Sequence, residues 1–147
     1  MALQKSSNGG SATGARLSSV RWLLYGRITL RMTGIALPGV VTTFITMSER
    51  KDEIDWEFVG GNVTEAQTNV FYKGIQEFNT HNTKEALPSR IDQPHTFTID
   101  WKKDTLSWLI DGQIVRTIYR ENATSPMVWY IPMYKRLKLT PIADPTR

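Results

Sequence analysis

The chain has 147 residues, a formal net charge of +4, 40% hydrophobic and 22% charged residues, which suits one globular domain with a buried core. It has no cysteine and only two histidines, so disulfides, thiolate metal sites and cysteine nucleophiles are excluded. No apolar stretch approaches the roughly 20 residues of a membrane-spanning helix, and no transmembrane segment is expected. Lysine and arginine are scattered along the chain, so we expect no nucleic-acid-binding face. We also expect no bound metal and no cofactor.

Residues 1–16 are expected to form a flexible N-terminal segment with a remnant strand. Lys5–Gly14 is rich in serine and glycine and has no hydrophobic period, which is typical of a flexible connection. Met1–Gln4 is followed at once by polar residues and lacks the pattern of a secretory signal, so we expect no signal peptide in this chain.

Residues 17–120 contain short runs rich in β-branched and aromatic residues, and these runs predict strands. The runs are Arg21–Met32, Gly39–Met47, Glu53–Val59, Ala66–Tyr72, His95–Trp101, Thr105–Ile110 and Gln113–Ile118. Strands at such close spacing are typical of an all-β sandwich or jelly roll. Asp111 and Gly112 stand between two of the runs and predict a hairpin with a two-residue type I′ turn. Trp101 and Trp108 are expected in the core.

Two further segments show no strand pattern. Gly74–Gln93 is polar, includes Pro88 and has no period, so we expect a long surface loop. Residues 121–147 contain an apolar stretch, Met127–Ile131, and a basic end with two prolines, Lys135–Arg147. We interpret 121–147 as an atypical C-terminal tail that contributes no strand to the sheet.

Alternating acids make one predicted strand a candidate catalytic element. Side chains of an extended strand alternate between two faces, so Glu53, Asp55 and Glu57 share one face and the three hydrophobic residues that follow them share the other. If the apolar face enters a core, the acids face a cleft or solvent. Glu53 and Glu57 are about 13 Å apart at Cα. Inclined side chains can bring their carboxyl groups to about 5 to 5.5 Å, the spacing of a retaining glycosidase. We expect the acids to titrate as a coupled group, with at least one pKa raised by its negative neighbours.

Two other interpretations of the acids remain open. They can be solvated charges on an exposed strand face, although like charges side by side destabilise a sheet and no Lys or Arg stands between Glu53 and Glu57. They can also bind a divalent metal ion, since hard cations bind clustered oxygens, but a strand offers fewer convergent ligands than a calcium loop does.

The run Asp52–Phe58 (DEIDWEF) resembles the active-site strand of glycoside hydrolase family 16, and other segments resemble its fungal Crh-type cell-wall transglycosylases. These other segments are Leu17–Ile28, Gly39–Ser48, Gln67–Phe71, His95–Trp101 and the hairpin at Ile110–Gly112. The resemblance implies an incomplete β-jelly roll, a concanavalin-A-like sandwich of antiparallel sheets. It also implies Glu53 as nucleophile, Asp55 as its electrostatic helper and Glu57 as general acid/base.

The resemblance further implies a polysaccharide donor and acceptor, chitin or β-glucan, and a covalent glycosyl-enzyme intermediate. A monomer with an extracellular or cell-wall location is expected. Gln67 and Asn69 lie two residues apart on the next predicted strand, so they share a face. If that strand pairs beside the acids, both amides are expected to bind sugar hydroxyls or to orient Glu57; otherwise they form a polar outer face. His95 heads its strand and is expected to have no catalytic role.

Three functions remain open on the sequence: a retaining enzyme, a non-catalytic carbohydrate-binding domain, and an inactive fragment of such an enzyme. The family's domain is expected to be longer at both ends, so weak or absent sugar transfer is expected. Asn62 and Asn122 begin Asn-X-Thr patterns for N-glycosylation, which are compatible with a secreted protein.

Overall fold

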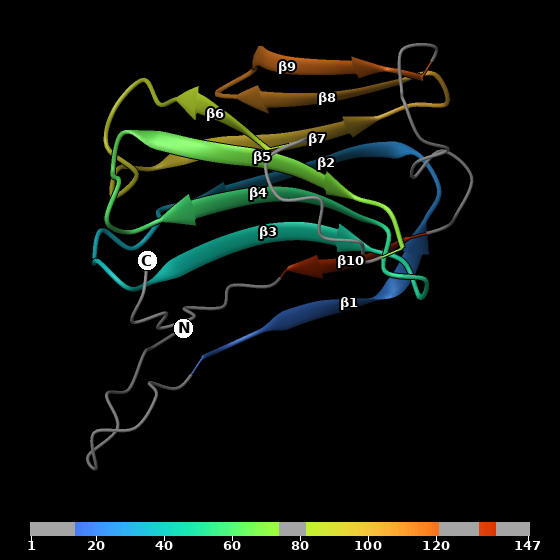
Figure 1. Cartoon of the computed structure of the whole chain (residues 1–147), viewed down its shortest axis with the longest axis horizontal. Coiled ribbons are helices and arrows are strands. Elements are labelled where there is room, and N and C mark those ends of the chain that lie inside the picture. The colour runs from blue at the N-terminus through green and yellow to red at the C-terminus, as the bar shows by residue number, and fades with distance from the viewer. Residues whose placement is uncertain (1–13, 74–81, 121–132, 138–147) are drawn as a thin grey trace.

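The computed structural model describes residues 14–73, 82–120 and 133–137, and the strands in these residues pair into two antiparallel sheets (Figure 1). The strands are β1 (Leu17–Leu23), β2 (Gly26–Met32), β3 (Val41–Met47), β4 (Glu53–Val59), β5 (Glu65–Phe71), β6 (Thr83–Ala86), β7 (His95–Trp101), β8 (Thr105–Ile110), β9 (Gln113–Tyr119) and β10 (Met133–Leu137). One sheet has six strands in the order β1-β10-β3-β4-β5-β6, and the other has four in the order β2-β7-β8-β9. The predicted all-β sandwich is confirmed.

The hydrophobic core lies between the two sheets and receives side chains from both. In β5 buried and half-buried residues alternate one by one, as expected for a strand with one face on a core. Three tryptophans of the core, Trp56, Trp101 and Trp108, are each at most 1% exposed. The predicted core positions of Trp101 and Trp108 are confirmed. The other buried members of the cluster are Phe44, Ile54, Phe58, Ala66, Val70, Ile91, Phe97, Ile99, Leu106 and Ile110.

The predicted run Arg21–Met32 is two strands rather than one. β1 ends at Leu23 and β2 begins at Gly26, and the two strands belong to different sheets. Tyr25 and Gly26 have φ angles of 60° and 137°, which redirect the chain from one layer to the other. The ring of Tyr25 packs edge-on against Trp101, with 5.1 Å between ring centroids. This contact with the core stabilises Tyr25 in the left-handed backbone conformation, which the local β pattern does not predict.

The predicted hairpin between β8 and β9 is confirmed. Asp111 and Gly112 join the two strands and have φ angles of 48° and 85°. Positive φ at both central residues is the geometry of a type I′ turn. The Asp111 carboxyl group fixes the turn: Oδ1 accepts a hydrogen bond from the N–H of Thr96, and Oδ2 lies 2.7 Å from Nδ1 of His95.

Two segments that were expected to lack strands contain one each. β6 lies within the expected loop Gly74–Gln93 and pairs with β5. β10 lies within the expected tail, and its backbone pairs with β1 on one side and β3 on the other. Both expectations are wrong at these residues, because pairing with an open strand edge satisfies backbone groups whatever the side-chain pattern. Residues 1–13, 74–81, 121–132 and 138–147 lie outside the described residues, and so does most of the expected N-terminal segment and tail.

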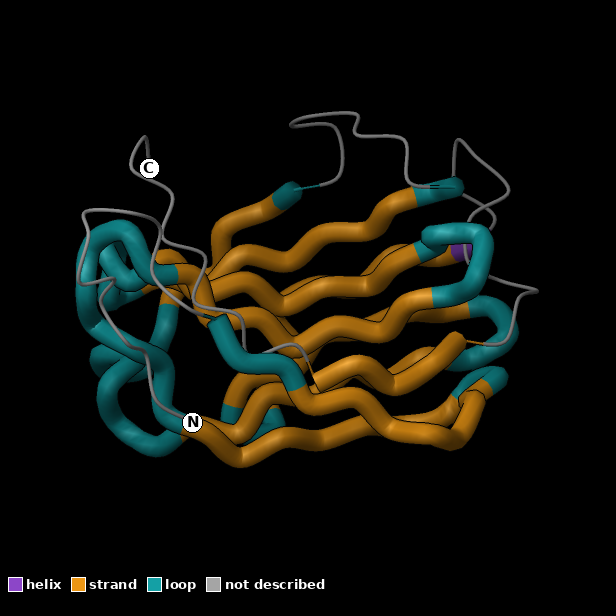
Figure 2. The backbone as a smooth tube through the Cα atoms, turned by 90° about the horizontal axis from the view of Figure 1, so that it is seen from below, coloured by secondary structure: helices purple, strands orange, loops and turns teal. Residues whose placement is uncertain are grey.

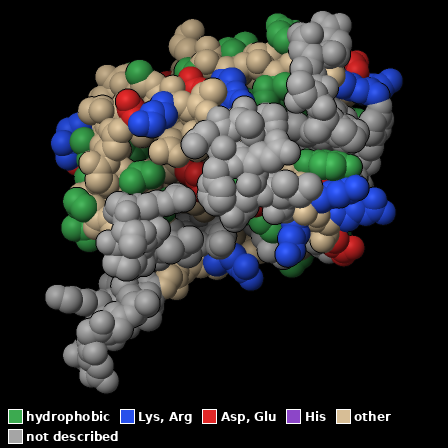
Figure 3. All heavy atoms as spheres, viewed as in Figure 1, with side chains coloured by type: hydrophobic (Ala, Val, Ile, Leu, Met, Phe, Trp, Pro, Cys, Tyr) green, Lys and Arg blue, Asp and Glu red, His purple; other side chains and the backbone are tan. Residues whose placement is uncertain are grey.

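The strands run across the molecule and the loops gather at its two ends (Figure 2). On the face shown in Figure 3, Lys and Arg side chains lie in separate groups rather than in one continuous patch. In the described parts of the chain, no helix is long and apolar enough to cross a membrane.

Candidate active site

Strand β4 carries the three candidate acids in the interior of the six-stranded sheet, between β3 and β5. Three hydrophobic residues of β4 are at most 2% exposed and form part of the core; they are Ile54, Trp56 and Phe58. Since successive side chains alternate, Glu53, Asp55 and Glu57 share the opposite face, away from the four-stranded sheet. The structure therefore places the three acids on one face, as the spacing predicts.

The three acids differ in burial. Asp55, in the middle, is only 1% exposed, whereas Glu53 and Glu57 are half-buried. The sequence led us to expect that all three acids face a cleft or solvent. In the structure the central carboxyl group is shielded, and only the two outer ones are partly accessible. Within 14–73 and 82–120, no three His, Cys, Asp or Glu side chains are grouped so as to hold a metal ion. Acids spread along a strand do not surround one point, which disfavours the metal interpretation.

Strand β5 brings the two candidate amides next to the acids. Asn69 lies opposite Asp55, and Gln67 lies opposite Glu57. Opposite residues of an antiparallel pair share a face, with Cβ atoms about 4.5 to 5.5 Å apart. Oδ1 of Asn69 accepts a hydrogen bond from the next backbone N–H at 2.9 Å, and Oε1 of Gln67 accepts one from Nδ2 of Asn82 at 3.0 Å. The condition set by the sequence, that the strand with the amides pairs beside the acids, is met, and the role of the amides in binding stays a prediction.

Two tryptophan side chains tie β4 to the four-stranded sheet behind it. Nε1 of Trp108 on β8 donates a hydrogen bond to the backbone oxygen of Asp55, at 2.9 Å. Nε1 of Trp56 on β4 donates in the opposite direction, to the backbone oxygen of Thr98 on β7, at 3.2 Å. Both bonds are buried and cross between the layers, so the backbone under the acids is held from below as well as by its neighbouring strands.

Arg116 of β9 holds β5 from below in a similar way. One of its terminal nitrogens, Nη1, donates to the backbone oxygen of Thr68 at 3.0 Å and to its Oγ1 at 2.8 Å. The guanidinium lies over the ring of Trp108, 4.8 Å from the centroid. Burial lowers the pKa of Arg116, and the negative charge of Glu85 opposes part of this shift. Because Thr68 lies between the two candidate amide residues, the contact fixes the segment that carries both of them.

Sequence reasoning missed Arg116 and Asp52, although each breaks a pattern. Asp52 directly precedes β4, and its carboxyl group is fully buried at a position where the alternation expects a core residue. Arg116 lies opposite Trp108 in the hairpin register, so a charged residue shares a face with a core tryptophan. A polar residue on the core side of a predicted strand is the signal that could have identified both.

His95 lies away from the acids, at the start of β7. Its Nε2 is 3.0 Å from Oγ of Ser89, and its Nδ1 is 2.7 Å from the carboxyl group of Asp111. The side chain is 4% exposed and joins the segment after β6 to the β8–β9 hairpin. These contacts join parts of the fold, and the absence of a catalytic role for His95 stays a prediction.

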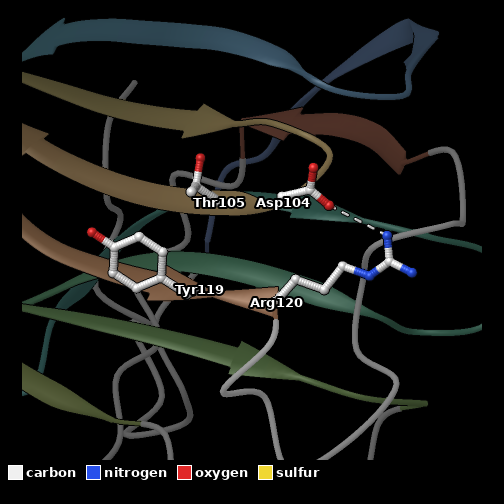
Figure 4. A pocket seen from close by; sticks show the side chains of 4 residues that line it. All are labelled: Asp104, Thr105, Tyr119 and Arg120. Carbon is white, nitrogen blue, oxygen red and sulfur yellow. Dashed lines mark hydrogen bonds and ion pairs between the residues drawn. The ribbon is translucent and has the colours of Figure 1, made fainter.

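A hollow of about 440 Å³ lies at one end of the four-stranded sheet, lined by Asp104, Thr105, Tyr119 and Arg120 (Figure 4). A terminal nitrogen of Arg120 is 3.4 Å from a carboxyl oxygen of Asp104 across the hollow. None of the described residues that line it belongs to β4 or β5, so these four residues are separate from the acids.

Comparison with known proteins places the chain in a family. Residues 1–141 match the sequence model described as glycosyl hydrolases family 16. Crh-like protein 2 of Aspergillus fumigatus is 35% identical over 134 residues, which cover 88% of this chain and 30% of that protein. Congo red hypersensitive protein 2 of Saccharomyces cerevisiae is 37% identical over 120 residues, covering 80% of this chain and 26% of that protein. The chain thus spans less than a third of the length of these relatives.

Solved structures agree with the sequence comparison. A Crh5 transglycosylase in complex with NAG superposes with a TM-score of 0.80 and 32% identity, over 91% of this chain and 56% of that one. A β-glucanase of Bacillus licheniformis superposes with a TM-score of 0.69 and 25% identity, over 92% of this chain and 63% of that one. The expected β-jelly roll is confirmed. A match over nearly the whole chain and the acids of β4 lead to one conclusion: the chain belongs to glycoside hydrolase family 16.

Proposed function

We propose that this chain carries the catalytic strand of a retaining glycoside hydrolase or transglycosylase that acts on β-linked cell-wall polysaccharide, chitin or β-glucan. One observation supports this most directly: Glu53, Asp55 and Glu57 share one face of β4, and amides of β5 lie opposite two of them. The relatives are Crh-like proteins, and one similar structure is a transglycosylase bound to NAG. The sugar in that complex supports a chitin-type donor.

In the first step, the carboxylate of Glu53 attacks the anomeric carbon of the donor and forms an ester bond to it. The bond from that carbon to the glycosidic oxygen breaks, and the carboxyl proton of Glu57 passes to the leaving oxygen. The donor's reducing-end part then departs as an alcohol, and Glu57 is left as a carboxylate.

In the second step, Glu57 takes a proton from an acceptor hydroxyl or from water, whose oxygen attacks the anomeric carbon and releases Glu53. Two inversions at one carbon retain the anomeric configuration. Asp55 lies between the two glutamates and is shielded from solvent. In that position it supports the nucleophile by a hydrogen bond or by holding a shared proton, and it acts without leaving the protein interior.

The amides and the glycosylation pattern extend the proposal. Gln67 and Asn69 use their amide oxygens for contacts within the protein, so their NH₂ groups are the part that would meet sugar hydroxyls.

Asn62 lies in the connection between β4 and β5 and is half-buried, while Asn122 lies outside the described residues. We propose an extracellular or cell-wall location and a monomeric enzyme.

The proposal is tested with Glu53→Gln and Glu57→Gln, using a chito-oligosaccharide donor and a fluorescently labelled glucan acceptor. Glu53→Gln should lower turnover by about a thousandfold or more, because it removes the attacking oxygen charge, and should leave sugar affinity within about twofold. With an activated aryl glycoside, whose leaving group needs no protonation, Glu57→Gln should accumulate a glycosyl ester on Glu53 that intact-mass and peptide analysis detects.

Asp104→Asn is the control, since this carboxyl group lines the separate hollow on the four-stranded sheet. It should leave turnover unchanged. Sugar binding without turnover in the unsubstituted chain would point to a carbohydrate-binding domain, and absence of both, without a cooperative unfolding transition, would point to an inactive fragment. Full turnover by Glu53→Gln would overturn the proposed mechanism.

A further inference from the structure

Asp52 is a buried acid that the proposed reaction does not use. It directly precedes Glu53 and is 0% exposed, although a carboxyl group is among the side chains least often found fully buried. Such a group persists in an interior only where hydrogen bonds replace those it made to water. The contacts of Asp52 therefore indicate what the residue holds in place.

Every polar group of Asp52 reaches a neighbouring segment. Its N–H donates to Oγ of Ser48 at 2.9 Å, and its backbone oxygen accepts from the N–H of Ser48 at 2.8 Å. Oγ of Ser48 in turn donates to Oδ2 at 2.8 Å. The other carboxyl oxygen, Oδ1, accepts a hydrogen bond from the backbone N–H of Lys73 at 3.0 Å. Ser48 follows β3 and Lys73 lies two residues beyond β5, so Asp52 joins the ends of three adjacent strands.

The two segments that Asp52 joins contain strained backbone. Lys51 has a φ of 65° and Lys73 a φ of 51°. Both angles lie in the left-handed region, which is unfavourable for most residues other than glycine and asparagine. Such conformations persist when surrounding contacts over-determine them. The four hydrogen bonds of Asp52 are contacts of this kind, because one residue fixes the turn on one side and the exit of β5 on the other.

We call the four hydrogen bonds of Asp52 the Asp52 clamp. Its position matters because Glu53 is the first residue of β4. In the sheet Glu53 lies opposite Met47 and Phe71, and no residue of β4 precedes it to hold its backbone. Glu57, in contrast, lies inside β4 with paired residues on both sides. We call Met47, Glu53 and Phe71 the Glu53 row, and the residues paired with Glu57 the Glu57 row. The Glu53 row is the last row at this end of β4, and the hydrogen bonds of Asp52 lie directly beyond it.

We infer that Asp52 is a positioning residue for Glu53: its hydrogen bonds to Ser48 and Lys73 fix the end of β4 and so the place of the nucleophile. This inference rests on the proposed function of Glu53. A nucleophile must be held within about 0.5 Å of its productive place. A displacement of about 1 Å costs roughly a hundredfold in rate. Loss of the clamp would slow ester formation at Glu53, and sugar binding by the rest of the face would persist.

The test uses Asp52→Ala, which removes both carboxyl contacts, and Asp52→Asn, which retains an acceptor oxygen for the Lys73 N–H. The first readout is residue-resolved amide hydrogen exchange. For Asp52→Ala we expect at least about tenfold faster exchange of amides in the Glu53 row and at Lys73, with the Glu57 row unchanged. Asp52→Asn should lie between this variant and the unsubstituted chain.

The second readout is the rate of ester formation on Glu53 with the activated glycoside. Asp52→Ala should lower kcat by about a hundredfold and leave KM within about twofold, and Asp52→Asn should recover part of the rate. Asp111→Asn is the matched control, because Asp111 also accepts a backbone N–H and a side-chain hydrogen bond, at the remote β8–β9 hairpin. It should change neither readout. If Asp52→Ala does not fold, Ser48→Ala removes both hydrogen bonds of the Ser48 hydroxyl group, to Oδ2 and from the N–H of Asp52, keeps the contact of Oδ1 with Lys73, and should speed exchange in the same row.

Unchanged exchange in the Glu53 row would overturn the inference, and so would equal rate losses in Asp52→Ala and Asp111→Asn. If the unsubstituted chain forms no ester, the proposed function fails, and hydrogen exchange by itself still decides whether Asp52 holds this row.

Discussion

Replacing each of the three core tryptophans with phenylalanine separates the packing of the ring from the hydrogen bond of its N–H. Trp108 donates to the backbone of β4 at 2.9 Å, and Trp56 donates to the backbone of β7 at 3.2 Å. Nε1 of Trp101 is also buried but has no hydrogen-bond partner among the residues that the structure describes. All three side chains are at most 1% exposed, so the three replacements remove similar buried ring area. Trp101→Phe is therefore the control for the other two.

The expected magnitudes follow from these contacts. Each replacement leaves a small cavity that costs on the order of 1 kcal/mol. Trp108→Phe also leaves the backbone oxygen of Asp55 without this donor, at a cost of about 1 to 3 kcal/mol. Trp101→Phe removes a buried N–H that has no described partner, and the relief offsets its packing loss. We expect the free energy of unfolding to fall by about 2 to 4 kcal/mol for Trp108→Phe and by less than about 1 kcal/mol for Trp101→Phe. Trp56→Phe should lie between them, because its hydrogen bond is longer.

Urea denaturation followed by circular dichroism measures these differences, since the midpoint and the slope m together give the free energy of unfolding. An unchanged m shows that the unfolded state is not altered. Equal destabilisation by Trp101→Phe and Trp108→Phe, at unchanged m, would refute the reasoning that the Trp108 N–H supports the strand that carries the acids.

Three other predictions concern stability and are measured by the same denaturation. Burial raises the pKa of Asp111, but its hydrogen bonds to His95 and to a backbone N–H, with nearby positive charge, outweigh burial and hold the pKa below its ordinary value. The stability that the ionised group contributes is therefore present above the unfolded pKa of about 3.9 and is lost as the pH falls through the lower folded value. Asp111→Asn should destabilise more at about pH 6 than at about pH 3, and equal losses would contradict this. Gly60→Ala should cost about 3 kcal/mol or more, because a Cβ there overlaps backbone oxygens, whereas Gly61→Ala, whose Cβ has ordinary contacts, should cost far less. Arg116→Ala should cost about 3 kcal/mol, since it removes two partly buried hydrogen bonds from a charged donor and a stacked aromatic contact; a loss under about 1 kcal/mol would show that these contacts do not hold β5.

Local features of the fold were predictable because they depend on neighbours in sequence. The alternation in Glu53–Phe58 decides which side chains enter the core, and the structure buries Ile54, Trp56 and Phe58 as expected. The Asp111-Gly112 pair requires positive φ at both positions, and both have it. A period of two and a two-residue turn are set by backbone geometry, so the sequence by itself determined the shared face of the acids and the hairpin.

Other features depend on strands that meet only after folding. Nothing in the patterns around Thr83–Ala86 or Met133–Leu137 predicts the edges that these segments join, and nothing local separates β1 and β2 into different sheets at Tyr25. The contacts of Asp52 with Lys73 and of Arg116 with Thr68 span 21 and 48 residues. Only the tertiary structure decided these pairings, because a hydrogen bond between distant segments depends on register and layer packing, which short-range periodicity does not encode.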